Sequence, residues 1–304
     1  MTAVLIQHHH AHITAVMAEH GLTGDQPVIG VAFDGTGYGD DGTIWGGEFL
    51  IADYHGYRRA AHLRPIPLPG GDKAVKEPWR IALAHWLDCG FSIADFENLY
   101  AEKHGFKRIF ADKSRKNLRL SAKISENPRT NPKLLDVVQH QITTGLNAPF
   151  TSSMGRLFDA VAALTGVRQT VNYEGQAAIE LEALVDDGET AVYPHTFQDG
   201  VIDVREMVTA VIHDTQNQRP ISQIAARFHN GIAHMVLNVC QSIRQQTSLQ
   251  QVALSGGVWQ NMTLLTKTTP LLQNAGFTVL IHHQVPANDG GLALGQAAIA
   301  ARVP

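Results

Sequence analysis

The sequence has few cysteines, and this scarcity excludes several kinds of site. Its 304 residues include two cysteines, Cys89 and Cys240, which lie far apart and match no zinc-binding or redox spacing. Two such cysteines suit a reducing compartment, so we expect a cytoplasmic protein. Packing in the core is the expected role of both thiols.

Net charge and long hydrophobic runs are also nearly absent. The 28 acidic side chains outnumber the 24 basic ones, for a formal net charge of −4. This balance gives no support for a broad nucleic-acid-binding surface, and we expect no nucleic-acid partner. No apolar run approaches the roughly 20 residues that a membrane span needs, and the first six residues are too short for a signal peptide, so we expect no membrane partner. A composition with 44% hydrophobic residues predicts a globular protein of one large or two smaller domains.

A histidine run near the start is the most informative local feature. His8 and His12, in the run Gln-His-His-His-Ala-His, are four residues apart. If the run opens a helix, both imidazoles project from one face, one turn apart, which is the spacing for two metal ligands from one element. An apolar stretch at 13–17 follows, and Gly21 would end the helix. Spacing alone leaves a metal site and a solvated polar turn equally open.

The rest of the chain shows strand and helix patterns that alternate late in the sequence, which predicts an α/β protein with parallel strands. Strand patterns cover residues 27–33, 43–53, 191–204, 251–254 and 277–282, with a hairpin turn at 39–42. Helical patterns cover 79–87, 134–145, 157–166, 177–185, 221–244, 262–275 and 291–301. A polar stretch at 97–132, with Lys113, Arg115, Lys116 and Arg119, is interpreted as a solvated insertion rather than a docking patch.

Three glycine-rich segments follow hydrophobic strands: Asp34-Gly35-Thr36-Gly37, Ser255-Gly256-Gly257 and Asp289-Gly290-Gly291. Glycine lets backbone amides approach an anion closely, so the three together suggest a phosphate or nucleotide cleft, although each alone fits an ordinary tight turn equally well. Asp34 and Asp289 are the best candidates to complete the histidine site, because two imidazoles with one or two carboxylates suit Zn²⁺ or Fe²⁺. Spacing does not show that these loops meet the histidines.

Eight motifs, in this order along the chain, resemble the HypF family of hydrogenase-maturation carbamoyltransferases. The resemblance is to the family's C-terminal domain, which is akin to the threonylcarbamoyl-transfer enzymes of tRNA modification. The motifs are Gln7–His12, Phe33–Gly42, Pro69–Asp72, Glu77–Arg80, Ser152–Asp159, Tyr173–Ala178, Ser255–Val258 through Asn261, and Asn288–Gly291. The Pro-Gly-Gly-Asp and Tyr-Glu-Gly-Gln-Ala-Ala motifs separate HypF-like chains from the tRNA-modification relatives.

The resemblance implies a two-lobed fold of the actin, heat-shock-ATPase and sugar-kinase type. The family's domain begins before its histidine motif, so residues 1–148 are expected to form an incomplete N-terminal lobe with the metal-binding histidines and the polar insertion. Residues 149–304 would form the C-terminal nucleotide-binding lobe. The implied metal ligands are His8, His12 and Asp289, with Asp34 as a fourth, and the metal would be Zn or Fe. The implied nucleotide-binding residues are Gly35, Thr36, Gly155, Asp159, Gly256, Gly257 and Asn261, with Asp159 on the ribose hydroxyls and Asn261 on the base or ribose.

The resemblance also implies a reaction. Carbamoyl-adenylate, made from carbamoyl phosphate and ATP in an upstream domain, would pass its carbamoyl group to the C-terminal cysteine of a HypE-type partner. That group becomes the cyanide ligand of nickel–iron hydrogenase. The nucleophile is then the partner's, so neither Cys89 nor Cys240 is expected to be catalytic. The 304 residues contain no adenylating domain, so we expect the chain alone not to make carbamoyl-adenylate. A small-molecule O-carbamoyltransferase and a non-catalytic nucleotide-binding fragment remain as alternatives.

Overall fold

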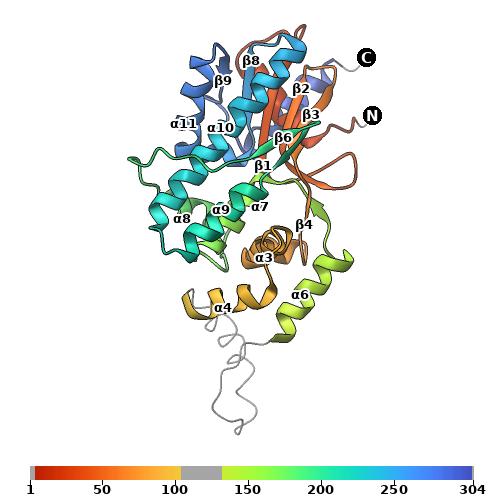
Figure 1. Cartoon of the computed structure of the whole chain (residues 1–304). Coiled ribbons are helices and arrows are strands. Elements are labelled where there is room, and N and C mark those ends of the chain that lie inside the picture. The colour runs from red at the N-terminus through yellow and green to blue at the C-terminus, as the bar shows by residue number, and fades with distance from the viewer. Residues whose placement is uncertain (1–3, 104–131, 303–304) are drawn as a thin grey trace, which may run out of the picture.

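The computed structural model describes residues 4–103 and 132–302. Within these ranges the chain forms a mixed α/β fold around a central sheet (Figure 1). The predicted basic cluster at Lys113, Arg115, Lys116 and Arg119 lies outside the described residues. No helix in the described ranges is long and apolar enough to cross a membrane.

One mixed sheet holds the strands of the described residues. Its main path runs β6-β7-β3-β2-β1-β8-β9, and the short strands β4 and β5 pair with each other beside β2. The strands are β1 (Val28–Tyr38), β2 (Ile44–Ala52), β3 (Tyr57–Leu63), β4 (Ile66–Pro67), β5 (Phe150–Thr151), β6 (Thr196–Gln198), β7 (Val201–Asp203), β8 (Gln251–Ser255) and β9 (Thr278–Leu280). Strand β1 is antiparallel to β2 but parallel to β8, and β8 is parallel to β9, so the parallel strands predicted late in the chain are present. The sheet takes strands from both sides of the boundary proposed at residues 148 and 149.

Helices cover both faces of this sheet, and two further helices in the lower part of Figure 1 pack against one of these helices instead. They are α1 (His8–Glu19), α2 (Asp72–Lys76), α3 (Trp79–Asp88), α4 (Ile93–Lys103), α6 (Pro132–Thr144), α7 (Met154–Leu164), α8 (Gln176–Glu182), α9 (Arg205–Gln216), α10 (Ile221–Thr247), α11 (Met262–Asn274) and α12 (Leu292–Ala300). Two short 3₁₀ turns, η1 (Gly257–Gln260) and η2 (Asp289–Gly291), follow β8 and β9 respectively. The first helix packs closely against the last one.

The alternation of side chains along β1 divides the core between the two faces. Val28 and Ala32 pack with Ile13, Val16 and Met17 of α1 in one cluster. The odd-numbered residues of this stretch of β1 belong to the larger cluster on the other face, which includes α3, α7 and α10. They are Ile29, Val31 and Phe33. This follows from the two-residue period of a strand, which sends successive side chains to opposite faces.

Most predicted elements are present, with several differences. The segment 34–37 is not a turn after β1 but part of β1, and the pairing with β2 is irregular between Phe33 and Gly37. No element was predicted where strands β3, β4 and β5 and helices α2, α4 and α9 lie, and α4 extends into the stretch interpreted as a solvated insertion. The hairpin between β1 and β2 does turn at 39–42, as the Gly-Asp-Asp-Gly sequence predicts.

Candidate metal and nucleotide site

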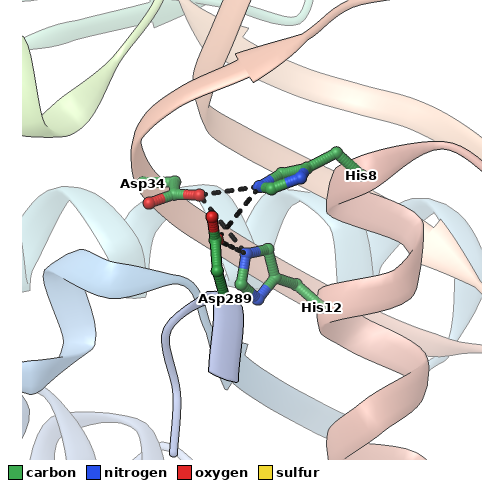
Figure 2. Close-up of side chains that lie close together, drawn as sticks. All are labelled: His8, His12, Asp34 and Asp289. Atoms are coloured by element: carbon green, nitrogen blue, oxygen red, sulfur yellow. Dashed lines mark hydrogen bonds and ion pairs between the residues drawn. The ribbon is translucent and has the colours of Figure 1, made fainter. Parts of the chain in front are cut away.

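The histidine run does open a helix. Helix α1 begins at His8, and Gln7 caps it, because the Gln7 side-chain oxygen accepts a hydrogen bond from the His10 backbone N–H at 2.8 Å. His8 and His12 project from the same face toward the end of β1 (Figure 2). The His12 ring is 1% exposed, whereas the His8 ring is 22% exposed. One imidazole is therefore fixed in the interior and the other borders solvent.

Both predicted aspartates meet the two histidines (Figure 2). Asp34, at the irregular step of β1, places Oδ2 at 2.9 Å from His8 Nε2 and 3.3 Å from His12 Nε2. Asp289, in η2, places Oδ1 at 3.5 Å from the Nε2 atom of each histidine. Four ligand atoms from three distant segments thus lie within 4.8 Å of one another.

This group has the chemistry and spacing of a divalent-cation site. Ligands at the usual zinc distances of 2.0–2.2 Å stand about 3.3 Å apart along the edges of a tetrahedron. The four nitrogen–oxygen distances, 2.9 to 3.5 Å, bracket that value. The buried Nε2 atom of His12 makes no hydrogen bond of good geometry, so it is free to act as a ligand atom. Two imidazoles and two carboxylates are a donor set that suits Zn²⁺ or Fe²⁺.

The electrostatics of the group favour charged ligands. Burial acts to raise the pKa of Asp34, but its contacts with the His12 and His8 imidazoles outweigh burial and hold that pKa well below its usual range. Burial acts to lower the pKa of His12, but its contacts with Asp289 and Asp34 outweigh burial, and the net pKa is raised. The contact with the His12 imidazole is the main reason that the pKa of Asp289 is lowered. The two carboxylates are therefore anionic at neutral pH and attract a cation.

Beside this group is a cavity of about 580 Å³, which Asp34 and Asp289 also line. Six of the seven residues predicted to bind nucleotide line it as well: Gly35, Thr36, Gly155, Asp159, Gly257 and Asn261. The cavity is bounded by the end of β1, the start of α7, helix α8 and the turns η1 and η2. The structure thus brings the predicted cation and nucleotide residues to one place.

Gly256 and Asn261 have structural partners of their own. Gly256 is not among the cavity-lining residues; its φ is +104°, and a Cβ there would lie 2.2 Å from the Phe33 carbonyl oxygen, so glycine lets β8 end close against β1. The Asn261 side chain caps α11 by accepting from the Leu264 N–H at 2.7 Å, and its amide nitrogen lies 2.9 Å from His229 Nε2. A contact between the Asn261 side chain and a nucleotide would compete with these bonds.

Arg156 is a charged residue of the cavity wall that was not predicted, although it lies inside one of the quoted motifs. Its guanidinium and the Asp159 carboxylate form an ion pair at 3.1 Å, and both residues are 2% exposed. The Nε and Nη1 atoms of Arg156 make no hydrogen bond of good geometry. Burial and, less strongly, Glu174 raise the pKa of Asp159 to about 6, against the opposing effect of Arg156. A buried cation on a cavity wall is suited to an anionic ligand. Arg156 could have been predicted from the sequence, because it directly follows Gly155, which was predicted to bind nucleotide.

The comparisons with known proteins place the chain in a family. The family model described as "Carbamoyltransferase, Kae1-like Domain, second subdomain" matches residues 30–296. The chain is 40% identical to the carbamoyltransferase HypF of Synechocystis sp. over 97% of this chain and 37% of that protein. It is 38% identical to a carbamoyltransferase HypF homolog of Cupriavidus necator over 99% of this chain and 72% of that protein.

Two solved structures are also similar. A full-length HypF in a phosphate- and nucleotide-bound form matches with a TM-score of 0.80 and 38% identity over 98% of this chain and 42% of that chain. The HypF of T. kodakarensis matches with a TM-score of 0.81 and 31% identity over 97% of this chain and 36% of that chain. The fold implied by the resemblance is therefore confirmed. This chain spans a little over a third of the length of several HypF relatives, and it belongs to the HypF carbamoyltransferase family as a Kae1-like domain.

Proposed function

We propose that this domain transfers a carbamoyl group from carbamoyl-adenylate to the C-terminal cysteine of a HypE-type partner in the cytoplasm, during cyanide-ligand synthesis for nickel–iron hydrogenase. The observation that carries the proposal is the position of Asp34 and Asp289, which belong both to the cation-ligand group and to the cavity wall. A ligand in the cavity would lie against the cation site. That juxtaposition suits an adenylate, because the oxygens of its reactive carbonyl and of its phosphate both need positive charge nearby.

The chain's own residues would bind and orient the adenylate. His8, His12, Asp34 and Asp289 would hold Zn²⁺ or Fe²⁺, which when bound supplies Lewis acidity toward a carbamoyl or phosphate oxygen. The backbone at Gly35, Thr36 and Gly257 borders the cavity and would approach the phosphate. Asp159 would accept hydrogen bonds from ribose hydroxyls, and the buried Arg156 would pair with the phosphate.

In the transfer step the partner's thiolate sulfur attacks the carbamoyl carbon. A carbon–sulfur bond forms, the bond between that carbon and the phosphate oxygen breaks, and AMP leaves with the electron pair. The thiol proton passes to solvent before the attack. The products are AMP and a thiocarbamate on the partner.

The chain's own thiols support an external nucleophile. Cys240 is buried at 0% exposure, and that burial raises the pKa of its thiol far above the usual range. Cys89 contacts the Arg205 carbonyl at 3.5 Å, and burial raises the pKa of its thiol too. Neither residue lines the cavity. A thiol kept protonated and away from the cavity is a poor nucleophile.

Metal content tests the cation site. Replacement of both His8 and His12 by alanine should abolish stoichiometric metal in elemental analysis. His10→Gln is the matched control, because His10 lies in the same run but its Nε2 contacts the Asp53 carbonyl at 2.6 Å instead. Full metal occupancy in the double variant would overturn the assignment.

Calorimetry tests the nucleotide side of the site. Asp159→Ala should weaken AMP binding by about tenfold or more, because ribose hydroxyls would lose their acceptor, and circular dichroism would check that the variant is folded. Unchanged affinity in the folded variant would contradict the ribose role.

Product analysis tests the reaction. Incubation with preformed carbamoyl-adenylate and a purified HypE-type protein should release AMP and add a carbamoyl group to the terminal cysteine, as seen by peptide mass spectrometry. The same partner with its last cysteine replaced by serine is the control and should stay unmodified. Carbamoylation of a small hydroxyl acceptor would favour an O-carbamoyltransferase. AMP binding with no transfer to either acceptor would favour a nucleotide-binding fragment.

A further inference from the structure

A chain of buried polar side chains runs from His12 away from the cation site. His12 Nδ1 lies 3.4 Å from the Ser255 hydroxyl, which lies 2.9 Å from His282 Nε2. His282 Nδ1 in turn lies 2.9 Å from Glu19 Oε2. Ser255 is fully buried, and the His282 and Glu19 side chains are 5% and 3% exposed. This arrangement links α1, the end of β8 and the loop after β9.

The direction of each hydrogen bond can be worked out from Glu19, the carboxylate at the far end of this chain of side chains. Hydrogen bonds from His282 and from the backbone N–H groups of His283 and Gln284 lower the pKa of Glu19 despite the opposing effect of burial, so Glu19 is an acceptor only. His282 must then donate from Nδ1, and burial, although Glu19 opposes it, lowers its pKa and favours the neutral ring. A neutral His282 accepts at Nε2, so Ser255 donates to it. The Ser255 oxygen is left to accept a hydrogen bond from the His12 Nδ1–H group.

The direction of these hydrogen bonds determines what the other ring nitrogen of His12, Nε2, presents to the cation site. A ring that donates from Nδ1 and carries one proton presents the lone pair of Nε2, the atom that lies 3.3 Å from Asp34 and 3.5 Å from Asp289. Ligating histidines usually donate their second ring nitrogen to a carboxylate, carbonyl or similar acceptor, which fixes their tautomer and orientation. Here the carboxylate would act through an intervening histidine and serine.

Glu19 also fixes the loop that leads to Asp289. Its Oε1 atom accepts from the backbone N–H groups of His283 and Gln284, at the start of the segment that ends in η2. One carboxylate on α1 therefore holds both the helix that bears two of the ligands and the loop that bears a third.

We propose that Ser255, His282 and Glu19 are positioning residues that hold the Nε2 lone pair of His12 toward the cation. The inference rests on the proposed cation site and adds to it the groups that orient a ligand. None of the three residues is among the ligands, so their effect is on affinity and ring orientation rather than on the donor set.

Zinc titration of the chain against a competing chelator tests the proposal. Ser255→Ala and Glu19→Gln should each lower zinc affinity by about tenfold to a hundredfold, the usual effect of removing such a partner. Ser255→Thr keeps the hydroxyl and should bind zinc like the unaltered chain. His20→Gln is the matched control, because His20 contacts the Ile281 carbonyl of the same loop at 2.8 Å but has no bond to Ser255 or Glu19. Thermal melts would check that each variant is folded.

Nitrogen-15 correlation spectra of the zinc-loaded protein give a second measurement. The His12 Nδ1 proton should be protected from exchange in the unaltered chain and in Ser255→Thr, and it should exchange rapidly in Ser255→Ala. Equal zinc affinity and equal protection in Ser255→Ala and Glu19→Gln would overturn the positioning role while leaving the cation site intact. An equal loss in His20→Gln would also overturn it, since movement of the loop would then explain the effect. Failure of the unaltered chain to bind zinc would overturn the cation site, and the positioning role with it.

Discussion

Gly295 is the point at which the last helix approaches the ligand-bearing first helix. A Cβ on Gly295 would lie 1.9 Å from the Ala11 carbonyl oxygen and 2.8 Å from Thr14 Oγ1. The first of these atoms belongs to the backbone of α1, one residue before His12. Gly295→Ala therefore cannot be accommodated by rotation of a flexible side chain, and α12 must move away from α1.

The sign of the stability change follows from two opposing effects. In a helix, alanine is favoured over glycine by about 1 kcal/mol. Forcing a methyl group into a packed contact costs about 1–3 kcal/mol, and the upper part of that range applies where a backbone atom must yield. We expect Gly295→Ala to lower the free energy of unfolding by about 1–2 kcal/mol. It should also weaken zinc binding, because the displaced turn of α1 includes His12.

Urea denaturation followed by circular dichroism measures the first effect, and zinc titration measures the second. Ala297→Gly, at an exposed position of the same helix, calibrates the propensity difference and should cost about 1 kcal/mol without changing zinc affinity. A Gly295→Ala chain at least as stable as the unaltered one, with the same zinc affinity, would refute the argument that close contact between α1 and α12 holds the ligand helix in place.

Three other measurements follow from the charges of the molecule. Burial raises the pKa of Asp159 from 3.8 to about 6, so the folded chain holds that proton more tightly than the unfolded one, and the free energy of unfolding should fall by about 2 kcal/mol as pH rises from 4 to 7. Asp159→Asn should remove that slope in urea titrations at several pH values, and an unchanged slope would contradict the assignment. Glu48 is fully buried and accepts from Arg59 Nε at 2.6 Å, so Glu48→Gln should destabilise the fold by about 3 kcal/mol in urea denaturation, and a change within experimental error would show that the pair contributes little. Zinc at a hundredfold excess over its Kd should raise the unfolding free energy by about 2.7 kcal/mol, and the double alanine variant of the two histidine ligands should show no such rise.

Local patterns were sufficient for much of the fold and for the orientation of two of the proposed ligands. The histidine spacing depends only on helix geometry, so α1 and the common orientation of His8 and His12 could be predicted from the sequence. The same holds for the long periodic helix α10 and for the Gly-Asp-Asp-Gly hairpin. In each of these the determining contacts lie within a few residues.

Features that depend on distant partners could not be predicted in this way. Asp34 reaches the histidines because pairing of β1 with β2 is irregular beyond Phe33, and a glycine-rich segment alone does not distinguish that arrangement from a turn. The amide of Asn261 caps a helix and contacts His229, two bonds that the motif does not reveal. Ser255 was grouped with its neighbouring glycines, whereas its hydroxyl lies between two histidines that are remote in sequence.

The two carboxylate oxygens of Asp34 explain why the cation site and the cavity should act as one unit. Its Oδ2 faces His8 and His12, while its Oδ1 accepts from the Gly35 N–H at 2.7 Å and from the Gly257 N–H at 3.3 Å. A cation held at Oδ2 would withdraw charge from the carboxylate, weaken Oδ1 as an acceptor and make those two N–H groups more available to an anion in the cavity. Such coupling would be reciprocal by thermodynamic necessity, so a phosphate in the cavity would strengthen cation binding by the same factor. A single residue at an irregular step of β1 thus provides a physical route by which nucleotide occupancy and metal occupancy favour each other.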